Sequence, residues 1–241
     1  VMNYPLQISG DKRLKTKRSI KDLTKQATTS MIKPVTNIKT ASSRFFEKSS
    51  AHKTDPKQGP HVKVKLAFFE ERYADIQSSK ALQILNEQDQ VLGELPANKA
   101  LRILSHKKNM DTWISFELGK KTLQAKRVKL RSLGILTIKN YSRKLGSNPY
   151  NQFRRQVNAH VDNTGQLVLV NELPIEEHLR GLSEEPSTEP TEKKHAIHVL
   201  ARSYALVYSG KKRKFRTSLY DLEDDPRTSQ FYLGYGWERY H

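Results

Sequence analysis

Three carboxylates lie close together in the sequence, between a glycine and a proline. Glu184, Glu185 and Glu189 fall in the short stretch between Gly181 and Pro190. A single carboxyl group can donate a proton to a glycosidic oxygen and then accept one, so each of these acids is a candidate general acid and base. They could equally be solvated acids of a surface loop. Their spacing alone does not decide between the two interpretations.

Other kinds of chemistry find little support in the residue types. The chain has no cysteine, which excludes disulfides, thiolate metal sites and a cysteine nucleophile. His195 and His198 are three residues apart, a spacing compatible with a metal, but no further ligand is placed beside them, which favours a surface pair. The sequence contains no Gly-rich phosphate loop, serine-nucleophile elbow or H-E-x-x-H motif. We therefore predict no metal and no cofactor.

Charge divides the 241 residues unevenly. The formal net charge is +18 and the mean hydropathy is −0.74. Residues 1–60 hold thirteen Lys or Arg against four Asp or Glu, a net of +9, and lack a sustained apolar period. They are predicted to be a flexible basic tail or linker. Such a charge calls for a polyanionic partner, which could be nucleic acid, an acidic membrane face or an anionic wall polymer.

Apolar segments give no sign of a membrane span. No window of about 18 or more apolar residues occurs. Residues 1–40 also lack the apolar core of a secretory signal. Because the chain begins with Val1 rather than methionine, an export signal could lie upstream of it.

From His61 onward the sequence alternates between apolar and polar residues. Val62, Val64 and Leu66 occupy every second position, as in a half-buried strand. Asp162 to Gly165 is a strong turn signal. Further strands are predicted over 81–85, 90–95, 101–104, 112–118, 122–130, 133–139, 153–161 and 166–170. Short strands at this spacing predict a β-rich module over 61–171, a small sandwich or barrel.

One long helix follows, over 190–209. Pro190 suits a first helical turn, and Gly210 is a natural terminator. Ala196, Val199/Leu200, Ser203 and Leu206/Val207 mark one face at helical spacing. The expected fold class is α+β, in which the β-rich module precedes a lobe over 172–241 with one long helix.

The stretch around the carboxylates resembles the stage II sporulation protein D family, which includes amidase-enhancer proteins of bacterial walls. The shared pattern covers about 70 residues in order. It begins at Asn171-Glu172-Leu173-Pro174-Ile175-Glu176-Glu177-His178-Leu179-Arg180-Gly181, continues at Ala201-Arg202-Ser203-Tyr204-Ala205, and ends with Tyr220-Asp221-Leu222 and Gln230-Phe231-Tyr232-Leu233-Gly234. The resemblance implies a protein of the cell wall or envelope, outside the cytoplasm.

The resemblance also implies a chemistry. Family members are lytic transglycosylases on peptidoglycan glycan strands, or partners that stimulate wall amidases. Glu184, three residues after Gly181, stands where the family has its catalytic glutamate, and Glu185 is the alternative position. The acid would protonate the glycosidic oxygen and then take the proton of the sugar's own C6 hydroxyl, which closes an anhydro ring. Such an acid is expected in a partly apolar cleft.

Four further residues are candidates for supporting roles. Arg202 would orient Glu184, contact the glycan, or form a structural ion pair with a loop acid. Tyr204 favours a core position. Asp221 and Tyr232 could line the sugar groove or only satisfy backbone groups. Tyr235 and Trp237 could also stack on sugar rings.

The sequence departs from the family pattern at several places. Asp224, Thr228 and Ser229 replace the Cys, His and Cys of many members, which supports the prediction of no zinc. The family's lobe normally extends past the position of His241, so the catalytic lobe is expected to be partial. Three interpretations follow: a lytic transglycosylase, a non-catalytic peptidoglycan-binding enhancer of an amidase, or a basic nucleic-acid-binding protein.

Overall fold

The structure is a computed structural model, and it describes residues 59–68, 72–141, 143–145, 147–184, 188–209, 214–215, 217 and 219–240. All of these belong to one compact unit that spans residues 51–241. The predicted basic tail, residues 1–60, lies outside the described residues except for Gly59 and Pro60. Within the described part of the chain, no helix is long and apolar enough to cross a membrane.

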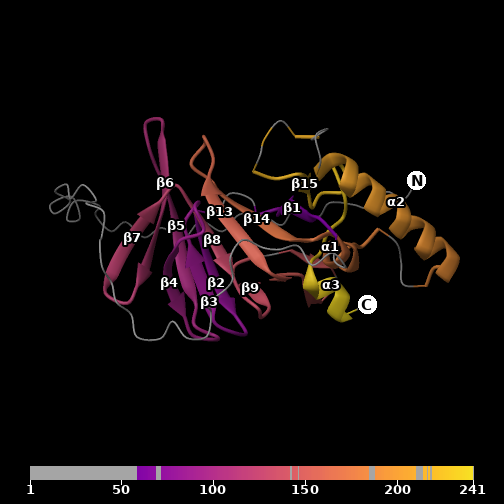
Figure 1. Ribbon diagram of the computed structural model, residues 1–241, viewed down its shortest axis with the longest axis horizontal. Helices are drawn as coiled ribbons and strands as arrows, with labels where there is room; N and C mark the ends of the chain where they lie inside the picture. The colour runs from indigo at the N-terminus through magenta and orange to yellow at the C-terminus, as the bar shows by residue number, and fades with distance from the viewer. Residues whose placement is uncertain are drawn as a thin grey trace, which may run out of the picture. The chain divides into compact units, whose positions relative to one another are not determined.

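Strands dominate the described residues, with three helices among them (Figure 1). The strands are β1 (His61–Lys65), β2 (Tyr73–Ser78), β3 (Leu82–Leu85), β4 (Val91–Leu95), β5 (Leu101–Lys108), β6 (Asp111–Leu118), β7 (Lys121–Ala125), β8 (Arg127–Arg131), β9 (Leu136–Ile138), β10 (Lys144–Leu145), β11 (Asn148–Pro149), β12 (Gln152–Phe153), β13 (Gln156–Val161), β14 (Leu167–Pro174) and β15 (Leu222–Glu223). The helices are α1 (Ile175–Arg180), α2 (Thr191–Ser209) and α3 (Tyr235–Tyr240). The expected mixed α+β class with one long helix is confirmed.

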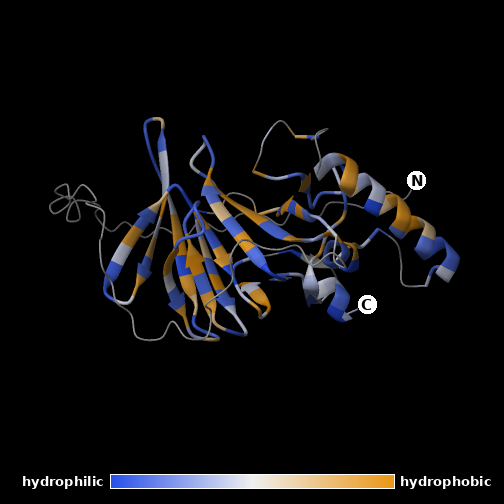
Figure 2. Ribbon diagram, in the orientation of Figure 1, coloured by the Kyte–Doolittle hydropathy of each residue, from blue (hydrophilic) through white to orange (hydrophobic). Residues whose placement is uncertain are grey.

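Two large sheets hold nearly all of these strands. One has the order β15-β1-β14-β13-β8-β3-β4 and the other the order β12-β9-β2-β5-β6-β7, while β10 and β11 form a separate hairpin. Neighbouring strands are antiparallel except for β1 and β15, which are parallel. Buried side chains of both sheets, such as Ile76 of β2, Phe116 of β6 and Val157 of β13, belong to a single hydrophobic core. Figure 2 shows the apolar residues alternating along these strands.

The predicted boundary between residues 171 and 172 falls inside a strand. β14 runs without a break from Leu167 to Pro174. It pairs with β1 on one side, with Val62 opposite Leu173, and with β13 on the other. The segment that carries the family pattern therefore continues the sheet of the β-rich part.

Two predicted strands are each divided between the sheets. Residues 122–130 form β7 and β8, which are separated at Lys126, and β7 pairs with β6 while β8 pairs with β13 and β3. Residues 153–161 divide in the same way into the end of β12 and β13, with Arg155 at a φ of 67° between them. At the first break the inward positions shift phase, from Leu123 and Ala125 to Val128 and Leu130, because two consecutive exposed residues lie between the two strands.

The long helix begins and ends close to prediction but buries a different face. Ala201 and Ala205 are its buried residues, and Tyr204 and Tyr208 pack beside the core. On the predicted face, Val199 is 57% exposed and Leu200 68% exposed. The apolar face marked in the sequence is therefore not the face that packs against the core. Small alanines let the helix backbone approach the body of the protein closely, and this proximity outweighs the greater hydrophobicity of the other face.

Candidate functional site

The loop after α1 is held against the segment before α3 by backbone hydrogen bonds. Leu182 and Tyr232 form an antiparallel bridge, the Ser183 amide donates to the Phe231 carbonyl at 2.8 Å, and the Leu233 amide donates to the Gly181 carbonyl at 2.8 Å. Residues about 50 positions apart in the sequence thus lie side by side.

Gly181 is required by the closeness of that contact. A Cβ atom at position 181 would lie 2.6 Å from the ring of Tyr232 and 3.0 Å from the carbonyl oxygen of Gly234. Its φ of −92° is open to any residue, so the constraint is space rather than backbone strain. Gly234 has both constraints, with a φ of 67° and a Cβ position 2.6 Å from the carbonyl oxygen of Gln152. The glycines of the pattern therefore serve close packing.

Glu184 reaches across this contact. Its Oε1 accepts a hydrogen bond from the Phe231 backbone amide at 2.8 Å. The side chain is otherwise exposed, which differs from the partly apolar cleft that we expected. Near it, the guanidinium of Arg143 lies over the Phe231 ring at 4.9 Å from the ring centroid. The alternative acid, Glu185, lies outside the described residues. Glu189 forms an ion pair with Lys193 at 2.8 Å.

A buried side-chain network fixes the segment that holds Glu184. Gln230 is 5% exposed; its Nε2 donates to the Ala201 carbonyl at 3.2 Å, and its Oε1 lies 3.1 Å from His178 Nε2. Because the Gln230 oxygen can only accept, His178 must carry its proton on Nε2. Burial lowers the pKa of His178 to about 4, so the ring is neutral at pH 7. Gln230 thereby ties α1 and α2 to the segment that contains Phe231.

Tyr232 continues the network into the sheet. It is 1% exposed, and its hydroxyl donates to Asn171 Oδ1 of β14 at 2.7 Å. Asn171 in turn donates through Nδ2 to the Arg154 and Gln156 carbonyls, both at 2.8 Å. The Tyr232 ring packs on His178, with centroids 4.9 Å apart. Tyr232 therefore lies in the core beneath the loop rather than at a groove surface.

The other residues proposed from the sequence have local partners. Arg202 forms a two-pronged ion pair with Glu176 of α1, at 2.8 and 2.7 Å, rather than with a loop acid. Tyr204 packs partly against the core, and its hydroxyl accepts a hydrogen bond from Lys214 at 2.8 Å. Asp221 is 4% exposed, and its Oδ2 accepts the Lys63 amide of β1 at 3.0 Å.

The aromatic residues near the end of the chain also pack within the protein. The guanidinium of Arg154 lies 4.4 Å from the centroid of the Tyr235 ring, and Trp237 packs on Tyr150 at 6.4 Å. Both aromatic side chains are only partly exposed. Their stacking on sugar rings stays a prediction.

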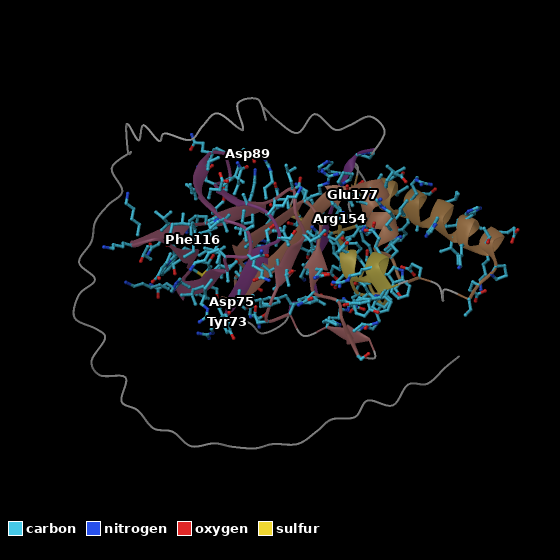
Figure 3. All side chains as sticks on the ribbon, turned by 90° about the horizontal axis from the view of Figure 1, so that it is seen from below. Tyr73, Asp75, Asp89, Phe116, Arg154 and Glu177 are labelled. Carbon is cyan, nitrogen blue, oxygen red and sulfur yellow. The ribbon has the colours of Figure 1, made fainter. Side chains whose placement is uncertain are left out.

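Sequence reasoning missed two ionic clusters, each of which contains a buried carboxylate, Glu177 in one and Asp224 in the other. Glu177 is 6% exposed, and both of its oxygens accept from Arg155 Nε at 2.9 Å; Arg154 makes a two-pronged pair with Glu238 of α3, with both distances 2.9 Å. Figure 3 shows Glu177 and Arg154 near the helices. The signal in the sequence was a Glu inside the N-E-L-P-I-E-E stretch together with two consecutive arginines, but no spacing rule joins them.

The second cluster lies at a position where many family members have cysteine. Asp224 is 1% exposed, its Oδ2 accepts from the Tyr141 hydroxyl at 2.9 Å, and Arg143 NH1 lies 2.7 Å from the same oxygen. Burial raises the pKa of Asp224, and the adjacent Arg143 opposes this effect. Thr228 bonds to Glu223 at 2.9 Å. Asp224 therefore joins the final segment of the chain to the loop after β9.

One comparison with known proteins identifies part of the chain. Residues 163–240 match the family model SpoIID, whose description is stage II sporulation protein. No curated protein and no solved structure gives a significant match. The matched range begins in the turn before β14 and ends with α3. It contains the contact between residues 181–184 and 230–234.

Proposed function

We propose that the chain, whose residues 163–240 match the SpoIID family of stage II sporulation proteins, is a lytic transglycosylase of peptidoglycan with Glu184 as its acid and base. The family is one of sporulation-related proteins associated with the cell wall or envelope. The single observation that carries the finer proposal is the state of Glu184, whose carboxylate is exposed and yet held by the Phe231 amide at 2.8 Å.

That state suits a group that exchanges protons with a bound polymer. One oxygen is anchored to a segment that Gln230 and Tyr232 fix to the body of the protein, so the carboxyl group is oriented without being enclosed. A glycan strand lying over it would exclude water from the carboxyl group only when the substrate is present. Access for a long polymer and a fixed direction for the acid are both needed for the reaction.

The reaction balances with one carboxyl group. The Glu184 carboxylic acid gives its proton to the glycosidic oxygen as the bond from that oxygen to C1 breaks. The resulting carboxylate removes the proton from the C6 hydroxyl of the same sugar, and the C6 oxygen bonds to C1. The products are a free hydroxyl on the leaving sugar and a 1,6-anhydro ring, and the acid is regenerated without consuming water. A second carboxylate to activate water, as hydrolysing glycosidases use, is not needed.

Mass spectrometry of soluble products tests the proposal. Purified sacculi and amidase-stripped glycan are incubated with the protein, with Glu184→Gln and with Glu189→Gln as a matched loop-acid control. We expect anhydro-muramyl ends from the unchanged protein and the Glu189 variant, and a loss of about 100-fold or more in the Glu184 variant. Equal release by both variants would exclude Glu184 as the acid.

The same exposure also favours a second function without catalysis. An exposed carboxylate bonded to a backbone amide is a common structural arrangement of a loop. If the unchanged protein releases no anhydro ends yet pellets with sacculi, the chain acts as a peptidoglycan-binding module. Stimulation of a wall amidase by both the unchanged protein and the Glu184 variant would then identify an enhancer.

A further inference from the structure

A pocket of about 620 Å³ opens beside the β13–β14 hairpin and is not formed by the residues of the Glu184 site. Its lining comes from β1, β8, β13 and β14 and from the chain that leads into β15. The buried side chains of Leu66, Phe68 and Leu167 give it an apolar floor. A concave site with such a floor and a few polar groups is the usual form of a small-ligand site.

Three cations line this pocket, and two of them are held only by exposed partners. Arg127 lies 3.6 Å from Glu87, with the two side chains 49% and 41% exposed, a separation too long for a hydrogen bond. Lys126 is paired with Asp111, where the side chains are 60% and 64% exposed. Exposed pairs of this kind contribute about 0–1 kcal/mol, so a ligand can compete for these cations. The third cation, Lys65, is engaged by Glu223 at 3.0 Å and lies over the Tyr220 ring.

Two acids line the pocket beside the three cations: Glu87, which faces Arg127 at 3.6 Å, and Asp162, which is held by its own turn. Asp162 Oδ1 accepts hydrogen bonds from the Thr164 amide, the Thr164 hydroxyl and the Gln166 amide, at 2.6–3.0 Å. These turn donors lower the pKa of Asp162, although its partial burial opposes them. The negative charge of Asp162 is thus stabilised by hydrogen bonds within the β13–β14 turn. The three cations would repel a cationic ligand, whereas they would donate hydrogen bonds to an anionic one.

The pKa of a histidine in the pocket wall depends on the charges around the pocket. His160 of β13 is 8% exposed. Burial lowers the pKa of His160 to about 4; the charges of Arg127 and Lys65 act in the same direction, and Asp162 opposes them. The ring is therefore neutral at pH 7 and can donate one N–H. An anion bound beside it would raise its pKa.

We propose that this pocket binds an anionic saccharide, with its carboxylate or phosphate directed to Arg127 and Lys126 and its less polar face on the apolar floor. Only the source of the ligand rests on the proposed function, because wall polymers carry both kinds of anion. The geometry of the pocket does not depend on whether Glu184 is catalytic. The site would hold a polymer by an anionic group at a distance from the point of cleavage.

The test follows the His160 ring signals by NMR in the whole chain. N-acetylmuramic acid supplies a carboxylate, N-acetylglucosamine 1-phosphate supplies a phosphate, and N-acetylglucosamine is the neutral sugar control. We expect saturable shifts and a raised His160 pKa with one or both anions, with the neutral sugar at least about tenfold weaker. The anion that binds more tightly identifies the source. High salt should weaken the binding.

Two variants distinguish this site from general charge effects. Arg127→Ala should weaken anion binding about tenfold or more, while Arg102→Ala, which removes an exposed arginine paired with Asp75 on the other sheet, should leave it unchanged. Equal loss in the two variants, equal binding of the neutral sugar, or no shift of His160 with either anion would overturn the proposal. Glu184→Gln should retain the binding, so a failure of the proposed catalysis would leave this result intact.

Discussion

Tyr232→Phe removes one buried hydroxyl without changing the shape of the ring. The hydroxyl donates to Asn171 Oδ1 at 2.7 Å, and both residues are at most 1% exposed. Removing the donor leaves the Asn171 oxygen buried without that partner, which costs about 1–3 kcal/mol. For a folded unit of this size each kcal/mol corresponds to about 3 °C, so the Tm should fall by about 3–9 °C. Urea unfolding and calorimetry both measure this loss.

Tyr204→Phe is the matched control for this substitution. Its hydroxyl accepts a hydrogen bond from the exposed Lys214, whose ammonium can turn to water when the hydroxyl is removed. The expected loss is within about 0.5 kcal/mol. A double-mutant cycle of Tyr232→Phe with Asn171→Ala should give a coupling of at least about 0.5 kcal/mol. If Tyr232→Phe costs no more than Tyr204→Phe, the argument that Tyr232 anchors the loop to β14 is refuted.

Three further predictions test the packing and protonation of the site. Between pH 6.5 and about 4 the unfolded chain should bind a proton that buried His178 refuses, so stability present above pH 6.5 is lost as the pH falls, by about 3 kcal/mol at most for this group. Urea titrations should show a smaller slope in His178→Phe than in the unchanged protein, and the slope that remains in the variant comes from buried His160, whose pKa is lowered in the same way. Gly181→Ala should lower stability by about 1–3 kcal/mol by calorimetry, whereas Gly119→Ala, which meets no atom within 4 Å, should cost only about 1 kcal/mol of backbone strain. On α2, Ala205→Leu should cost about 1–3 kcal/mol by overpacking, while Leu200→Ser stays within about 0.5 kcal/mol; a reversed order would restore the helix face expected from the sequence.

Local patterns were sufficient to predict many of the elements. Alternation of Val62, Val64 and Leu66 predicted β1, and the Asp162–Gly165 stretch predicted the turn between β13 and β14. β2 was missed although Ala74, Ile76 and Ser78 alternate in the same way. These features depend on neighbours in the chain, because side-chain period and turn chemistry are properties of a few consecutive residues.

The sequence by itself determined the family pattern, the long helix and Glu184 as the residue to examine. Only the tertiary structure decided what Glu184 touches, because its partner Phe231 is 47 residues away and the amide that binds it carries no signal in the residue type. The same holds for α2, where Ala201 and Ala205 rather than the larger apolar residues face the body. Local patterns do not distinguish between the possible helix faces or hydrogen-bond partners. Long-range contacts decide among them, because the residues that become buried depend on how distant segments pack against one another.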